Sequence, residues 1–232
     1  MELILQGTVE ALRLLARLDP GVMRILWLSL QLSGLATLLA LAVGVPLATG
    51  LAFRRFPGRS LAVALVNTGM GLPPVVVGLF VSILLWRSGP LGALEMLYTP
   101  GAIVAAQFVI ALPVVVGLGL AALQQLDPKL RSQLQSLGAS RLQALGVLLL
   151  EARLPMLAAV IAAFGAVISE VGAVMMVGGN ILGYTRVLTT ATVLETRQGH
   201  FDVAIALSLI LLGISFLVTW VLTSVQQRGA PR

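Results

Sequence analysis

Long stretches without a charged residue alternate with short charged segments along this chain. The four longest uncharged stretches cover residues 25–53, 60–86, 96–126 and 203–227. Each exceeds the roughly 20 residues that a helix needs to cross the hydrocarbon core of a bilayer. A fifth apolar stretch is interrupted only by Glu170. The pattern therefore predicts five transmembrane helices, near residues 24–53, 61–86, 101–126, 154–177 and 203–225.

The first residues follow a different pattern. Polar side chains recur at helical spacing beside a parallel apolar stripe, which is typical of a helix lying in the membrane interface. The polar positions are Gln6, Glu10, Arg13 and Arg17, and the apolar ones are Leu5, Val9, Leu12 and Ala16. We expect this interfacial helix to cover residues 3–18 and to be ended by Asp19-Pro20-Gly21.

Composition supports a membrane protein and narrows the chemistry. The chain is 58% hydrophobic and 10% charged, with a mean hydropathy of +1.02, whereas soluble domains carry roughly 25% charged residues. Its 232 residues fit a single transmembrane domain over 1–232. The net charge of +6 is spread between apolar stretches and forms no basic face for nucleic acid. Without cysteine and with His200 alone, no metal site is expected.

The arginines and the one lysine predict an orientation. Loops on one side of the five predicted spans hold 9 of these bases, and loops on the other side hold 6. Cytoplasmic loops carry the excess of positive charge. We therefore expect a multi-pass protein of the cytoplasmic (inner) membrane, with the N-terminus outside and the C-terminus in the cytoplasm.

Prolines and glycines interrupt the predicted spans. Pro46 and Pro113 stand alone, whereas residues 67–74 combine Asn, Thr, two Gly and two Pro. Packed transmembrane helices tolerate proline because neighbouring groups satisfy the freed carbonyls. Two interpretations remain open: ordinary kinks, or a broken helix that lines a transport path, for which residues 67–74 are the better candidate.

The segment 127–153 is too polar to span a bilayer. Asp127-Pro128 predicts a helix start, and Leu130, Leu134 and Leu137 form one apolar stripe along the helix that follows. A second helical stretch follows Ser140. Such a segment has an apolar face but no lipid to bury it in, so we expect it to bind a partner protein.

At this point the sequence resembles the permease subunits of ATP-binding-cassette (ABC) importers. Leu137-Gly138-Ala139-Ser140 matches the LGAS core of their cytoplasmic loop, although Ser132–Leu134 stand where that family has Glu-Ala-Ala. Further segments are similar to the molybdate, tungstate and sulfate permeases, and most of all to the tungstate type. They are residues 67–78, 89–92, 98–100, 111–113, 169–181 and 183–190.

The resemblance implies an all-α fold of the type I importer (MetI-like) kind and an assembly around it. The partners would be an ABC ATPase subunit, an extracytoplasmic oxyanion-binding protein and a second copy of this chain in the lipid bilayer. The chain itself would be no enzyme and hold no cofactor, which agrees with its lack of a G-x-x-x-x-G-K-[ST] phosphate loop. The transported ion would be tungstate, with molybdate and sulfate as alternatives.

The resemblance also assigns candidate sites. Residues 127–153, named the coupling loop from here on, would contact the ATPase through Leu134, Leu137, Gly138, Ala139, Ser140 and Arg141. Glu170, Met175, Met176 and Asn180 are candidates for the translocation path or its gate. Thr185, Arg186, Thr189 and Thr190 are candidates for a rim that docks the binding protein or meets the anion.

Two of these groups have a second interpretation. A carboxylate repels a dianion, so we expect Glu170 to hold helices together or to gate the path rather than to bind substrate. Met175 and Met176 suit ordinary packing as well as a constriction, and Gly178-Gly179-Asn180 suits a helix end. A rival function, a secondary transporter or channel that needs no ATPase, would leave the coupling loop without a use and would favour internal repeats, which we do not find.

Overall fold

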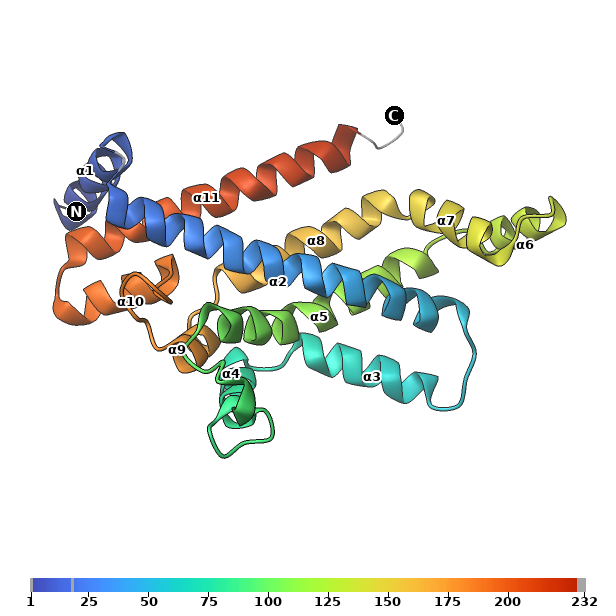
Figure 1. The fold of residues 1–232 in the computed structure, drawn as a ribbon. Coiled ribbons are helices and arrows are strands. Elements are labelled where there is room, and N and C mark those ends of the chain that lie inside the picture. Colours follow the sequence, from blue (N-terminus) through green and yellow to red (C-terminus); the bar gives the residue numbers. More distant parts are fainter. Residues whose placement is uncertain (1, 18, 229–232) are drawn as a thin grey trace.

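A computed structural model describes residues 2–17 and 19–228, and all regular structure among them is helical. Figure 1 shows the arrangement. The elements are α1 (Glu2–Ala16), α2 (Pro20–Phe53), α3 (Arg59–Met70), α4 (Pro74–Leu85), the short 3-10 helix η1 (Gly92–Leu94), α5 (Pro100–Gln124), α6 (Pro128–Ser136), α7 (Arg141–Glu151), α8 (Arg153–Ile168), α9 (Gly172–Gly178), α10 (Leu188–Gln198) and α11 (Phe201–Arg228).

Three helices begin with the same local code, a capping side chain followed by proline. Asp19 precedes Pro20, Thr99 precedes Pro100 and Asp127 precedes Pro128. In each case the side-chain oxygen accepts a hydrogen bond from a backbone N–H of the first turn, which satisfies a donor that the helix itself leaves free.

This code corrects one prediction about the N-terminal segment. Asp19-Pro20-Gly21 does not end the first helix but begins α2, and α1 already ends at Ala16. Leu18, the last residue of the predicted interfacial helix, lies outside the described residues. Helix α1 packs on α11, where Gly7 lies so close to Ile205 that an added Cβ would be 2.4 Å from its side chain.

The centre of the fold is a seam between α2 and α5 made of small side chains. Ser33, Ala36, Ala40, Gly44 and Ala48 recur at helical spacing on α2, and all are buried. An added Cβ at Gly44 would come within 2.7 Å of Val115 on α5. Small residues of this kind let helix backbones approach closely in membranes, where dispersion contacts replace the hydrophobic effect as the driving force.

Five single spans were predicted, and two of them differ in the structure because each is divided into two helices. Helices α2, α5 and α11 are each long and apolar enough to cross a membrane. The predicted span 61–86 is instead α3 and α4, bent by 104°. The predicted span 154–177 is α8 and α9, separated by residues 169–171. The described residues thus hold three such helices, or up to five spans if each of the two bent pairs, α3–α4 and α7–α8, counts as one.

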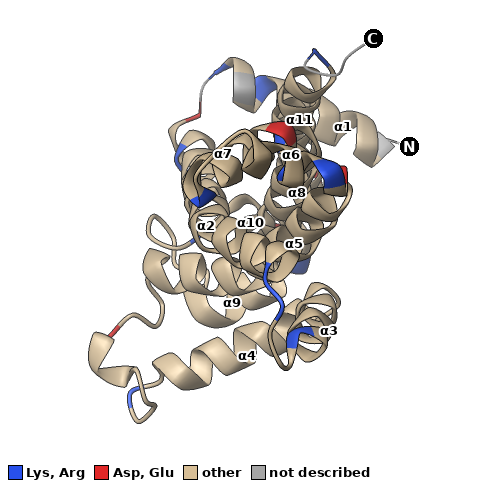
Figure 2. Ribbon diagram, turned by 90° about the vertical axis from the view of Figure 1, so that its right-hand side faces the viewer, with Lys and Arg blue, Asp and Glu red and all other residues tan. Residues whose placement is uncertain are grey.

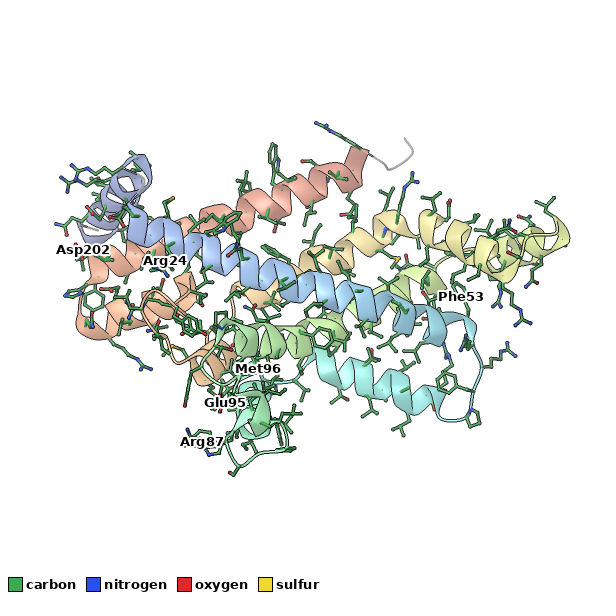
Figure 3. The ribbon with its side chains drawn as sticks, viewed as in Figure 1. Arg24, Phe53, Arg87, Glu95, Met96 and Asp202 are labelled. Atoms are coloured by element: carbon green, nitrogen blue, oxygen red, sulfur yellow. The ribbon has the colours of Figure 1, made fainter. Side chains whose placement is uncertain are left out.

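The molecule is elongated, with different elements at its two ends. Helices α6 and α7 lie at the end that faces the viewer in Figure 2, and α1 and α10 lie at the opposite end of Figure 1. In Figure 3, Phe53 marks the first end, while Arg24 and Asp202 mark the second. Helix α4 leaves the bundle sideways, as Figure 2 shows, and exposes Leu79, Phe80 and Ile83.

Candidate translocation site and coupling loop

A partly open cavity lies at the break between α3 and α4. Gly71 ends α3, and the consecutive Pro73 and Pro74 lack the N–H groups that would continue it, so the chain turns here. The cavity measures about 280 Å³ and is lined by residues 69–74 with Val77, Ile110, Val114 and Ala166. Residues 67–74 therefore hold a helix break, whereas Pro46 and Pro113 lie inside continuous helices; a role of this break in a transport path stays a prediction.

A second break, at residues 169–171, lies next to the first. An added Cβ at Gly172, the first residue of α9, would be 2.6 Å from Val75 on α4. An added Cβ at Gly78 would be 2.6 Å from the Cα of Ala173. The two helix breaks therefore contact each other through glycines beside the cavity. In membrane transporters, substrate sites are typically formed by discontinuous helices of this kind.

Glu170 sits in the second break, 9% exposed, and it caps α9. Its Oε1 accepts a hydrogen bond from the backbone N–H of Ala173 at 2.9 Å. Its backbone carbonyl accepts a second bond from the hydroxyl of Thr189, also at 2.9 Å. A carboxylate is favoured at a helix N-terminus by the free N–H groups there. These contacts support the expected structural role, and Glu170 does not line the cavity.

The remaining path candidates lie along α9. Met175 and Met176 are half-buried, and neither lines the 280 Å³ cavity. Met176 instead packs near Gly78 of α4. Gly179 and Asn180 take left-handed backbone conformations, with φ of 67° and 53°, so they end α9 as the sequence indicated. The amide oxygen of Asn180 is buried and has no hydrogen-bond partner.

Buried polar side chains that the sequence analysis did not single out join helices of the bundle. The amide of Gln107 on α5 donates to the carbonyl of Val167 at 2.9 Å and to the hydroxyl of Ser33 at 3.3 Å. Ser29 accepts from the backbone N–H of Leu188 at 2.9 Å. These bonds join α2, α5, α8 and α10. The sequence held a signal for these residues, because a polar residue inside an apolar span is expected to face protein rather than lipid.

The predicted external rim is mostly turned inward. Thr185, Thr189 and Thr190 are buried, and their hydroxyls bond to the protein itself. These three hydroxyls are therefore not exposed at the surface, as the predicted docking rim would require. The sequence could not separate a solvated polar loop from residues 188–198, which form the packed helix α10. Of the four residues, only Arg186 is partly exposed.

The coupling loop projects from the opposite end as two short helices. Asp127 caps α6, and Ser140 with Gln143 forms a reciprocal capping box on α7. Between the helices, Gly138 has φ of 81°, a backbone conformation that favours glycine. Leu137 and Leu142 are 84% and 81% exposed, so the loop presents large apolar side chains with nothing covering them.

The other predicted contact residues share this surface. Ala139 and Leu134 are half-buried, and Ser140 and Arg141 are exposed. Arg131 fastens the loop to the end of α2: its guanidinium lies 5.4 Å from the centre of the Phe53 ring and donates to the Phe53 carbonyl at 3.3 Å.

These features define a helical membrane permease with interrupted spans around a small cavity and an uncovered helical loop at one end. Residues 40–229 match the family of binding-protein-dependent transport system inner membrane components, and the chain belongs to this family.

Several relatives are similar over most of their length. A probable anion ABC transporter permease of Haloferax volcanii is 42% identical over 80% of this chain and 82% of its own. The tungstate uptake system permease protein TupB of Peptoclostridium acidaminophilum is 39% identical over 98% of this chain and 100% of its own. A molybdenum transport system permease of Escherichia coli K12 is 32% identical over 92% and 98%.

A solved structure confirms the fold class. One chain of the MetNI methionine ABC transporter, in an inward-facing conformation, superimposes with a TM-score of 0.75. The superposition covers 93% of this chain and 99% of that chain, and the two sequences are 17% identical. The all-α, MetI-like permease fold that the sequence predicted is therefore confirmed, although the number of spans is not.

Proposed function

We propose that this chain is the membrane subunit through which an ABC importer carries tungstate into the cytoplasm. The observation that carries the proposal is the similarity to a tungstate permease over essentially the whole of both chains. The relative named for molybdenum keeps molybdate as the second candidate. Sulfate is the third candidate, because a relative named as a sulfate transport system permease is also similar to this chain.

The coupling loop is the proposed contact with a separate ATPase subunit. Exposed leucines on short, well-capped helices suit a groove on a partner protein. No phosphate-binding loop exists in the sequence, so the energy would come from that partner. ATP binding would draw the loops of two copies together, and Arg131 would pass this movement to α2 through Phe53.

The remaining partners follow from the two ends of the molecule. With the coupling loop in the cytoplasm, the end that carries α1 and α10 faces outside, where an oxyanion-binding protein would dock. A second copy of the chain would cover the exposed side chains of α4, and the anion path would run between the copies. The two broken spans beside the 280 Å³ cavity would be the moving parts of that path.

Uptake into proteoliposomes tests the proposal. The permease, a cognate ATPase and a tungstate-binding protein should together accumulate tungstate only with ATP, and Leu137→Asp should abolish both ATPase copurification and uptake. Selectivity then follows from competition among tungstate, molybdate and sulfate. Accumulation by the permease alone, without ATPase or ATP, would instead establish a secondary transporter or channel.

A further inference from the structure

A second cavity lies at the end of the molecule opposite the coupling loop. It measures about 170 Å³ and is formed between the start of α2 and the turn that joins α9 to α10. Its lining includes Arg24, Ile25 and Leu28 from α2, and Leu182, Gly183 and Arg186 from the turn. The cavity shares no residue with the one beside α3 and α4.

The charge of this cavity is unbalanced. It is lined by two guanidinium groups and by no carboxylate, and neither arginine is in an ion pair among the described residues. The Nε of Arg186 is buried and has no hydrogen-bond partner. Buried donors in folded proteins are almost always paired, so an unpaired one indicates a missing acceptor. The cavity at α3 and α4, by contrast, is lined by no charged residue.

Hydrogen bonds fix the turn that precedes Arg186 and hold the guanidinium of Arg24 against that turn. Thr185 is fully buried, donates to the carbonyl of Gly178 at 2.5 Å and accepts from the N–H of Ile181 at 2.9 Å, which fixes the turn just before Arg186. Arg24 donates to the carbonyl of Gly183. Gly183 has φ of 74°, a backbone conformation that favours glycine.

We propose that this cavity binds a tetrahedral oxyanion between Arg24 and Arg186. The planar fork of a guanidinium matches two oxygens of such an anion, and two of them balance a dianion. Ile25, Leu28 and Leu182 line the rest of the cavity, which is open to solvent on the side of Arg24 and Leu182 because both residues are exposed. The volume holds several waters, which is enough for an ion of five heavy atoms.

The inference rests on the proposed function for its ligand and its direction. With the N-terminus outside, the cavity would receive the anion that the binding protein releases, ahead of the path itself. The same chemistry is offered by the phosphate of an anionic lipid, since α1 and the start of α2 lie at the predicted interface. The test must therefore present the two oxyanions separately.

The test measures tungstate binding to the purified permease–ATPase complex without any binding protein, in nanodiscs of neutral phosphatidylcholine. Arg186→Gln and Arg24→Gln should each weaken binding by about tenfold or more, because each removes a charged hydrogen-bond donor. Arg186→Lys should fall between wild type and Arg186→Gln, because it keeps the charge but loses the fork. The matched control is Arg197→Gln, an exposed arginine in the last turn of α10, which should bind like wild type.

Equal binding by wild type and the Arg24 and Arg186 variants, or no binding by wild type, overturns the inference. A second series in nanodiscs with phosphatidylglycerol identifies the source. If this lipid displaces tungstate from wild type, the site's oxyanion is a lipid phosphate; if it does not, the site takes the free ion. Proteoliposome uptake separates the two proposals. If tungstate is taken up but its binding does not depend on Arg24 and Arg186, only the proposed site is wrong. If binding depends on these arginines but no tungstate is taken up, only the proposed transport function is wrong.

Discussion

Two glycines of the coupling loop differ only in backbone conformation. Gly138 has φ of 81°, whereas Gly146 lies inside α7, and neither has an atom within 4 Å of an added Cβ. Gly138→Ala should lower stability by about 1–2 kcal/mol, the cost of a left-handed conformation in a residue with a Cβ. Gly146→Ala should raise it by about 0.5–1 kcal/mol, because alanine favours the helix.

Thermal unfolding of the solubilised protein measures the difference, and copurification with the ATPase measures its effect on coupling. Gly138→Ala should lose part of the ATPase binding, and Gly138→Val more of it, while Gly146→Ala should keep it. Equal melting temperatures for the two alanine variants would show that the turn in the coupling loop does not require glycine.

Glu170 offers a second test at the scale of one side chain. Glu170→Ala removes the acceptor for the N–H of Ala173 and should cost about 0.5–2 kcal/mol, as the loss of a helix cap does. Glu170→Gln keeps an acceptor but loses the charge that the helix N-terminus favours, and should cost about 0.3–1 kcal/mol. Thermal melting of the two variants ranks them.

Transport separates capping from gating at this residue. A cap alone predicts that Glu170→Gln lowers assembly and uptake together, while the tungstate affinity of the binding protein stays unchanged. A variant that assembles like wild type but hydrolyses ATP without uptake would identify a gate. Wild-type assembly, melting and uptake in Glu170→Ala would leave the carboxylate without any role.

At the scale of elements, Arg131 joins the coupling loop to α2. Arg131→Gln removes the contact with the Phe53 ring, which is worth about 0.5–1 kcal/mol at an exposed site, and the bond to its carbonyl. Since the substitution leaves the exposed Leu137 and Leu142 unchanged, the ATPase should still bind. Uptake per ATP hydrolysed should fall, because movement of the loop is no longer passed to α2.

Lys129→Gln provides the matched control on the same helix. It removes one exposed positive charge from α6 and no side-chain contact among those described. Its ratio of uptake to hydrolysis should equal that of wild type. If Arg131→Gln shows the same ratio too, the link to Phe53 plays no part in coupling.

Several helix ends could be predicted from the sequence, although Asp19-Pro20-Gly21 was assigned to the end of one helix and begins the next. Asp127, Ser140 and Gly179 act through their nearest neighbours in sequence, so their capping roles could be recognised from residue type and spacing alone. The break at residues 71–73 could be named as one of two alternatives. The cavity beside this break depends on how α5 and α8 pack there, and packing between distant segments could not be predicted from a local pattern.

The external segment shows the opposite case. Its threonines have the composition of a solvated loop, yet Thr185 and Thr190 are fully buried and bond to backbone groups. Arg24 and Arg186, 162 positions apart in sequence, share a cavity that no local pattern could indicate. The sequence could therefore indicate local helix caps, whereas the burial of these threonines and the pairing of the two arginines depend on tertiary contacts.

For the whole molecule, orientation is the property to measure first. Ser132 in α6 and Thr196 in α10 are both exposed and lie at opposite ends. Single cysteines at these positions, in a chain that has none of its own, should react with an impermeant maleimide from opposite sides of the membrane, Ser132→Cys from the cytoplasm. Reaction of both from one side contradicts the predicted topology. Thr189 is unsuitable as a label site because it is buried.

The seam between α2 and α5 has a mechanical consequence. Its serines, alanines and glycines have few or no rotamers to rearrange, so the contact cannot absorb a displacement by repacking. At 1.5 Å per residue, the 34 residues of α2 form a rod of about 50 Å. A tilt of about 5° at the Phe53 end would displace the Arg24 end by about 4 Å. Movement at the coupling loop would therefore reach the arginine cavity through α2 and α5 together, and a bulky residue at Gly44 would push these two helices apart.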